Sequence, residues 1–212
     1  FYTREQKQPV SFSTDSKYLF FGNAAMVEKW MLPEIERVDT WPASTGGWLV
    51  AMDVSPDGTQ VVTGMGIRGF DKNVRAWSAE TGDLVFERAT SLSYGVGYIA
   101  HSFDGALLAT YREFGNGPCE IWNATDGTWI AEFDSYSWTQ ALSFSGDGNA
   151  VFISAYRRER IDGVYVGRDE ISLWDWKTGK LVTAFPGIAN VVSFRGSDEF
   201  LYLTPEGHLT RA

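Results

Sequence analysis

The chain has 212 residues, 44% of them hydrophobic and 15% aromatic, and a formal net charge of −9. A chain this acidic is a poor partner for nucleic-acid backbones and anionic membranes, because both attract clustered Lys and Arg. Its single Cys, Cys119, excludes an internal disulfide and a Cys-based zinc site. It also fits a reducing compartment, so we expect a cytoplasmic protein. No apolar run approaches the roughly 18 residues of a membrane-spanning helix.

Four similar segments follow one another along the chain, and each contains four short apolar runs. An apolar run leads to a turn at Asp, a second run, a variable loop, a third run that ends in Trp, a second turn, and a fourth run. The segments cover residues 10–41, 48–87, 98–133 and 140–185, and residues 190–212 supply the inner strands of a fifth. Four strands per unit of roughly 40–50 residues are typical of a propeller blade.

Two markers recur in every copy. One marker is a Trp at the end of the third apolar run of each copy. The four runs read VEKW, VRAW, CEIW and ISLW, and they end at Trp30, Trp77, Trp122 and Trp174. We expect these Trp side chains to wedge between neighbouring sheets as structural residues.

The other marker is an Asp-Gly pair between the first and second runs. It occurs at Asp57, Asp104 and Asp147, with weaker copies at Asp15 and Asp198. Because Gly adopts positive φ, we expect two-residue hairpins at the Asp-Gly pairs.

Together the four copies resemble the WD40 repeat, on the pattern Ser-x-Asp-Gly followed by Trp-(Asp)-x-x-Thr-Gly-x-Leu-Val. Only Trp174-Asp175 shows the Trp-Asp dipeptide itself, and the Gly-His pair that usually opens a unit is missing. The familiar His–Asp–Ser–Trp network is therefore not expected, and His101 is interpreted as a core residue. The resemblance implies an all-β propeller of four-stranded antiparallel blades, which holds partner proteins.

About five blades are visible, whereas rings of the resembled family generally have seven or eight. The chain also begins with Phe1 rather than Met and shows no signal peptide, so we expect a trimmed, processed or excerpted sequence. Three explanations follow, in order of preference. The chain is part of a larger ring, it pairs with a second chain to close one, or it is a compact five-bladed variant.

The loops between second and third strands are predicted to crowd one face, and loops on a rigid scaffold are the usual place for binding. The longest of them, residues 155–170, carries four Arg in a chain of net charge −9. One interpretation is a contact for an acidic or phosphorylated protein segment. The alternative is a solvated hairpin whose Arg residues pair with Glu159, Asp162, Asp169 and Glu170.

Aromatic residues near the start of inner strands add candidates for the same face, with packing between blades as the alternative. The predicted partner-binding residues are Trp48, Arg68, Phe70, Tyr94, Tyr111, Arg112, Tyr136, Trp138, Tyr156, Arg157, Arg158, Arg160 and Tyr165.

The sequence shows no catalytic motif. There is no Gly-x-Ser-x-Gly elbow or phosphate-binding Gly loop, and the two His, His101 and His208, are far apart. We therefore expect no enzyme activity, cofactor or metal, and a scaffold for protein–protein interaction within a larger complex or chain. The first alternative is an accessory propeller of a larger enzyme or signalling protein. A propeller enzyme with its active site at the channel is the second.

Overall fold

The structure is a computed structural model that describes residues 8–44, 47–66, 71–112, 115, 117–135, 138–186, 188–193, 200–203 and 209–211. Within these ranges only the backbone is described for residues 158–159 and from 188 onward. The chain forms two compact units, residues 1–99 and 100–212, which are described separately. None of the described residues forms a helix that could cross a membrane.

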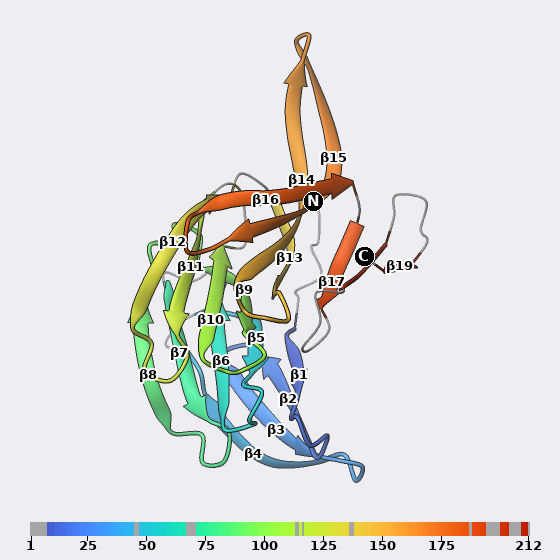
Figure 1. Cartoon of the computed structure of the whole chain (residues 1–212). Helices are drawn as coiled ribbons and strands as arrows, with labels where there is room; N and C mark the ends of the chain where they lie inside the picture. The colour runs from blue at the N-terminus through green and yellow to red at the C-terminus, as the bar shows by residue number, and fades with distance from the viewer. Residues whose placement is uncertain are drawn as a thin grey trace, which may run out of the picture. The chain divides into compact units, whose positions relative to one another are not determined.

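All the regular structure in the described residues is β-strand, arranged in five antiparallel sheets (Figure 1). In each sheet the strands follow one another in chain order. The first sheet comprises β1 (Val10–Phe12), β2 (Tyr18–Asn23), β3 (Met26–Met31) and β4 (Glu36–Pro42). The second comprises β5 (Leu49–Val54), β6 (Gln60–Met65), β7 (Asn73–Ser78) and β8 (Leu84–Ala89). The third comprises β9 (Val96–His101), β10 (Leu107–Arg112), β11 (Gly117–Asn123) and β12 (Trp129–Ser135).

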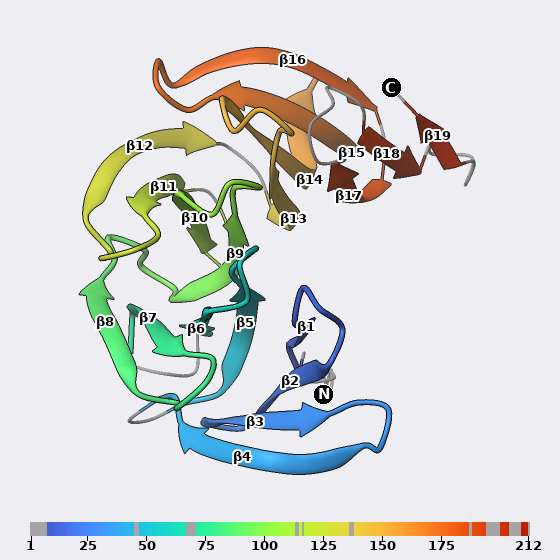
Figure 2. The same cartoon turned by 60° about the horizontal axis from the view of Figure 1, so that its bottom comes forward.

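The fourth sheet comprises β13 (Trp138–Phe144), β14 (Ala150–Ile161), β15 (Val164–Asp175) and β16 (Lys180–Pro186). The fifth has three strands, β17 (Ile188–Ser193), β18 (Phe200–Leu203) and β19 (Leu209–Arg211). Four repeated four-stranded sheets confirm the predicted all-β, blade-like fold, and Figure 2 shows each of them as a twisted four-stranded unit. That residues 1–212 form a single propeller stays a prediction.

The Asp-Gly turns differ from the predicted two-residue hairpins. In the second sheet the Ser55 amide donates to the Gln60 carbonyl at 2.9 Å, which leaves a four-residue loop between them. The Asp57 carboxylate accepts the Ser55 hydroxyl at 2.6 Å and the Thr59 amide at 3.0 Å. Gly58 follows at φ 74°, where a residue with a side chain would be strained. The turn is wider than predicted because the Asp side chain itself satisfies the backbone and the neighbouring hydroxyl.

The same turn recurs at Asp15, Asp104 and Asp147, each of which accepts the hydroxyl of the Ser two residues before it. At Asp147, hydrogen bonds from Ser145 and Asn149 lower the pKa of the carboxyl from its ordinary value of 3.8 to about 2. A group whose pKa is depressed in the folded state stabilises the fold above its unfolded pKa. That contribution disappears as the pH falls from about 4 toward about 2.

Replacing Asp147 with Asn should therefore lower stability most at pH 6, and the gap to the wild type should shrink as the pH falls below 4. Urea unfolding at several pH values measures this gap. A gap that is the same at pH 6 and pH 2.5 would show that the charge of Asp147 contributes nothing to the turn.

The repeated Trp residues are not equally buried. Trp77 and Trp122 are buried, and their indole N–H groups donate to Thr63 at 2.9 Å and Thr110 at 3.0 Å. Trp174 is half-buried, and its ring stacks on Phe133 of the third sheet with centroids 5.6 Å apart. The predicted wedge between sheets is thus seen at Trp174.

Trp30 departs from the prediction because it is only half-buried, and its N–H donates to Glu28 at 3.1 Å. Val27 belongs to the core shared with the second sheet, and Trp30, three residues further along β3, lies on the opposite face of that strand. The prediction of core packing is therefore met only in part at Trp30, whose side chain keeps some exposure to solvent.

Candidate functional site

The longest predicted loop, residues 155–170, is a regular β-hairpin. β14 and β15 pair with each other along their whole length. The pairing of β13 with β14 extends only as far as Tyr156, and the pairing of β16 with β15 extends only as far as Glu170. The turn residues Asp162 and Gly163 have φ of 49° and 83°, the two positive values of a type I′ turn. Residues 157–168, called the arm below, therefore project beyond the fourth sheet (Figure 1).

The segment is therefore a hairpin, as one of its two interpretations expected, because Asp-Gly between two extended runs favours a two-residue hairpin, whatever the length of the runs.

One face of the arm carries Tyr165 and Arg160 and continues into Tyr156 and Trp138 of the sheet at its base. In the register of the strands Trp138 lies opposite Tyr156, and Arg160 lies opposite Tyr165. The Arg160 guanidinium lies 5.9 Å from the centroid of the Tyr165 ring, within reach of a cation–π interaction. The Tyr156 ring covers Gly167, where any side chain would collide with it. Because Trp138 is 54% and Tyr165 64% exposed, this aromatic face offers large, rigid contact area to a partner.

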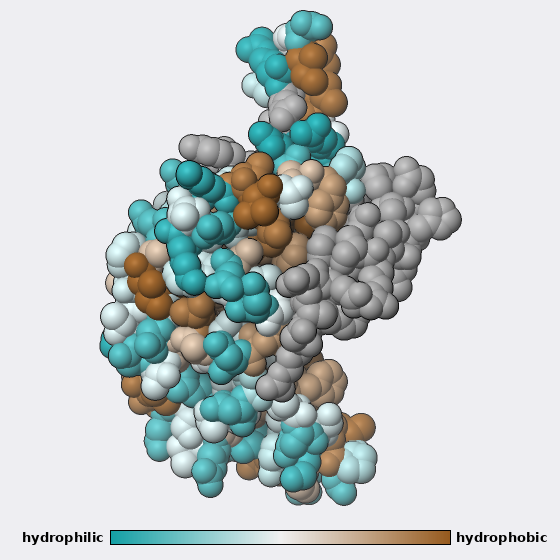
Figure 3. Space-filling model, in the orientation of Figure 1, coloured by the Kyte–Doolittle hydropathy of each residue, from teal (hydrophilic) through white to brown (hydrophobic). Residues whose placement is uncertain are grey.

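The opposite face of the arm combines apolar side chains with an ion-pair cluster. Ile161, Val164 and Val166 are all exposed, although each is strongly apolar. Figure 3 shows the resulting mixture of apolar and hydrophilic surface on the arm. Closer to the sheet, Arg157 and Arg168 contact the two oxygens of Glu170 at 3.1 and 3.0 Å. The buried Glu170 thus holds two guanidiniums and leaves the cluster with a positive charge.

The Arg residues of the arm differ in their surroundings. Arg157 and Arg168 have internal ion pairs, as the solvated-hairpin alternative expects. Arg160 is exposed and donates to the Gly163 carbonyl at 3.4 Å. The side chain of Arg158 lies outside the described residues.

The other candidates are spread over both units. Trp48 and Tyr94 of the first unit are exposed, as partner-binding residues would be. Arg112 ends β10 and is half-buried. Arg68, Phe70 and Tyr136 lie outside the described residues.

Tyr111 requires a correction, because it is fully buried and cannot meet a partner. It lies within β10 rather than in the following loop, and its hydroxyl donates to the Ser135 carbonyl of β12 at 2.8 Å. Burial raises the pKa of this hydroxyl above its ordinary value. Tyr111 is the fifth residue of a strand that is buried on both faces from Leu108 to Tyr111, whereas the prediction started the loop at Tyr111.

A cavity of about 610 Å³ opens between the first two sheets, and its lining includes Lys29, Asp15, Asp57 and Glu80. Lys29 is buried, donates to the Ala79 carbonyl at 2.8 Å and lies 4.4 Å from the centroid of the Tyr18 ring. Its counterparts before the other repeated Trp residues are Ala76, Ile121 and Leu173. Lys29 therefore joins the two sheets at a position that is apolar in the other copies.

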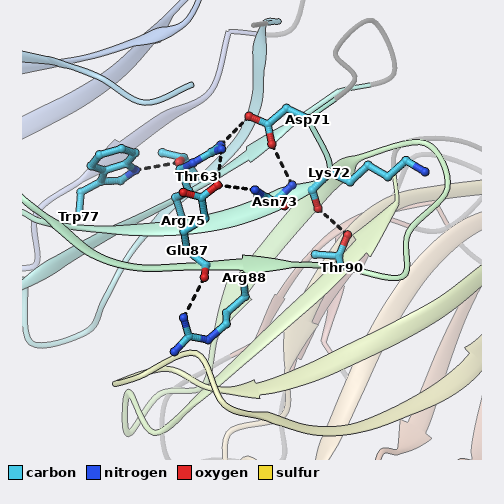
Figure 4. A network of polar contacts seen from close by, with 9 residues as sticks. All are labelled: Thr63, Asp71, Lys72, Asn73, Arg75, Trp77, Glu87, Arg88 and Thr90. Carbon is cyan, nitrogen blue, oxygen red and sulfur yellow. Dashed lines mark hydrogen bonds and ion pairs between the residues drawn. The ribbon is translucent and has the colours of Figure 1, made fainter. Parts of the chain in front are cut away.

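The second sheet contains a denser polar network, drawn in Figure 4. Arg75 is 5% exposed and contacts Asp71 and Glu87, each at 2.7 Å. Burial opposes its charge, but hydrogen bonds to these two carboxylates outweigh burial and raise the pKa of the guanidinium above its ordinary value. Asn73 also contacts both carboxylates. Its backbone N–H donates to Asp71, and its side-chain amide donates to Glu87. The charged groups of the network thus contact one another, which is typical of a structural cluster.

None of the described residues forms a group of three or more His, Cys, Asp or Glu that could hold a metal ion. Cys119 is fully buried, and burial raises the pKa of its thiol far above the ordinary value, which disfavours the reactive thiolate. That the chain is not an enzyme and has no cofactor stays a prediction.

No family model matches the chain, and no curated protein matches it in sequence. Among solved structures the fold is similar to hydrazine synthase from Kuenenia stuttgartiensis, with a TM-score of 0.71 and 14% sequence identity. The match covers 95% of this chain and 60% of that protein, so the chain spans less than two thirds of its length. The fold is β-propeller-like. At 14% identity the likeness shows the fold alone, and it says nothing of whether the repeats are WD40 repeats.

Proposed function

We propose that this chain is a WD40-like, non-catalytic scaffold that binds partner proteins through the arm. The observation that carries the proposal is the two-stranded projection. One of its faces exposes Tyr165 and continues into the exposed Trp138 at its base, and the other face exposes apolar side chains. A monomeric protein rarely exposes such residues together unless they meet a partner.

The charge of the arm indicates the chemistry of that partner. The arm holds four Arg and two acidic residues, whereas the whole chain has a net charge of −9. A basic segment on an acidic body attracts acidic surfaces and orients them toward itself. We therefore propose an acidic or phosphorylated protein segment as the partner, met within a larger complex in a reducing, cytoplasmic environment.

An arm-deleted variant tests the proposal. Because Tyr156 and Asp169 lie opposite each other, Asn-Gly can replace residues 157–168 and close the two strands with a type I′ turn. We expect proteins that co-purify with the wild-type chain from its native source to be lost from this variant. The matched control is Val182→Lys on the exposed β16, which should retain them. Retention of every partner by the arm-deleted variant would contradict the proposal.

Two point variants separate the chemistry within the arm. Arg160→Glu reverses the exposed guanidinium, and we expect it to weaken binding about tenfold or more by replacing attraction to an acidic partner with repulsion. Tyr165→Ala removes an exposed ring and should weaken binding without altering its salt dependence. Dissociation constants measured at low and high salt distinguish these two effects, and an Arg160→Glu variant that binds like the wild type would exclude an acidic partner.

An accessory propeller of a larger enzyme or signalling protein is the second candidate. It is supported by the match to hydrazine synthase, whose chain is longer than this one and whose name is that of an enzyme. Intact mass measurement of the polypeptide in its native source tests it. A catalytic domain in the same polypeptide would favour the accessory role.

A further inference from the structure

The cavity between the first two sheets has a polar lining to which the arm contributes nothing. Its volume of about 610 Å³ lies within the range of small-molecule sites. Residues of its lining also join the two sheets. Thr14 donates to the Pro56 carbonyl at 2.7 Å, and Lys29 donates to the Ala79 carbonyl at 2.8 Å. These two contacts fix the separation of the sheets, so the cavity is formed before any ligand enters.

Lys29 brings a buried charge to this lining. The residue is only 8% exposed, so its ammonium has lost most of its contact with water. The ammonium donates to one carbonyl and lies 4.4 Å from the centroid of the Tyr18 ring. Within the part of the chain that the structure describes, no acidic side chain forms an ion pair with it. An ammonium has three N–H donors, and a buried charge without a counter-ion is costly. The cavity therefore offers an unbalanced positive charge to an anionic group.

The pair of Lys29 and Tyr18 occurs in the first sheet alone among the four repeated sheets. The residues at the position of Lys29 in the other copies are Ala76, Ile121 and Leu173. The residues at the position of Tyr18 are Gln60, Leu107 and Ala150. Three of the four sheets thus form with neither a cation nor a ring at these places. The architecture of the sheet therefore does not account for the pair.

The other charged residues of the lining are the acids Asp15, Asp57 and Glu80. Asp15 already pairs with Lys17 at 3.2 Å. Asp57 receives its side-chain and backbone hydrogen bonds on Oδ1, and the bond from Ser55 lowers the pKa of this carboxyl below its ordinary value, so it is ionised. Glu80 is exposed, and no described residue forms a hydrogen bond or an ion pair with its side chain. Two negative charges thus remain for a ligand, in addition to the positive charge of Lys29.

We propose that this cavity binds a small zwitterion of the amino-acid type. The carboxylate of the ligand accepts the remaining N–H groups of Lys29, and its ammonium faces Asp57 and Glu80. A simple anion would meet repulsion from the two acids, and a simple cation would meet repulsion from Lys29. A zwitterion avoids both, and the rings of Tyr18 and Phe20 in the lining offer contact to its apolar part.

The two ends of the ligand contribute differently. The ion pair with the buried Lys29 is screened little by water, so it supplies most of the affinity. The pairs with the acids lie closer to solvent, so they are weaker and mainly decide which ligand is preferred. None of these residues belongs to the arm, and the inference does not depend on the partner proposed above.

A ligand series on the wild-type chain tests the chemistry. The common amino acids are added one at a time at millimolar concentration, and saturation-transfer NMR detects those that bind. We expect at least one to bind. Its amide lacks the carboxylate and its N-acetyl derivative lacks the ammonium, and the amide should bind at least tenfold more weakly than the amino acid. Absence of binding by every amino acid would overturn the proposal, as would an amide or an N-acetyl derivative that binds as tightly as the amino acid itself.

Two variants of the full chain test the placement of the ligand. Lys29→Met keeps an unbranched side chain without the charge, and it should raise the dissociation constant of the amino acid at least tenfold. Urea unfolding should show no loss of stability, because an apolar side chain replaces a buried charge that lacks a counter-ion. Glu80→Gln should reduce the preference for the amino acid over its N-acetyl derivative about twofold or more. The matched control is Lys180→Met on the outer strand β16, which should bind like the wild type.

The outcomes separate a binding role of Lys29 from a structural one. A folded Lys29→Met variant that binds the amino acid like the wild type would overturn the proposal. An unchanged preference in Glu80→Gln would overturn the placement of the ammonium beside this acid. The ligand series uses the wild type, so it decides the proposal even where Lys29→Met fails to fold.

Discussion

Replacing Trp77 with Ala should lower the free energy of unfolding by about 3–5 kcal/mol. Trp77 is buried in the core between the first two sheets, together with Phe20, Val27 and Trp41. Its removal leaves a cavity that the flanking strands cannot fill, and it leaves the Thr63 hydroxyl without the indole N–H at 2.9 Å. Urea unfolding of the full chain measures the loss.

Trp30→Ala is the matched control, because Trp30 occupies the same place in the repeat but is only half-buried. It should cost less than half as much, since a half-buried ring removes less apolar area from water. Equal losses in the two variants would show that burial by the adjacent sheet does not distinguish these residues.

Replacing Arg75 with Ala should cost about 3–5 kcal/mol, because it breaks a buried ion pair by removing one partner. Asp71 is as buried as Arg75, with side chains 7% and 6% exposed, and would lose the guanidinium of Arg75 as its partner. Glu87 is 40% exposed and can turn to water, so the penalty comes mainly from Asp71.

Arg88→Ala is the control for this prediction, since Arg88 lies on the same strand as Glu87 but is exposed and donates to a backbone carbonyl (Figure 4). We expect a change within about 0.5 kcal/mol, as for most surface substitutions. Thermal or urea unfolding of both variants checks the pair. A loss at Arg75 no larger than that at Arg88 would contradict a stabilising role for the network.

Much of the local structure was predictable because its causes lie within a few residues. The place of the turn at Asp57 was predicted, although its width was not, and it depends on Ser55, Gly58 and Thr59, all within four positions of one another. The order of strands follows from these turns and from the repeated Trp. The hairpin turn of the arm also has a local cause in Asp162-Gly163.

The functional surface was predictable only in part. The aromatic and Arg residues of the arm could be named, but their division between two faces depends on the register of β14 against β15. That register places Arg157 with Arg168 on Glu170 and places Arg160 with Tyr165 on the other face. Tyr111 was predicted to lie in an exposed loop. The strand β10 extends further along the chain than predicted, so Tyr111 belongs to the strand and is buried.

What the sequence determined by itself is the repeat, the turns and the alternation of each strand. What only the tertiary structure decided is which of the alternating faces is covered. Trp30 and Trp77 occupy the same place in the repeat, yet one is half-buried and the other is buried in the core that the first two sheets share. Arg75 likewise finds its counter-ions on a loop and on the next strand. Burial and ion pairing depend on residues of neighbouring strands and sheets, which are distant in the sequence, and a local sequence pattern does not specify them.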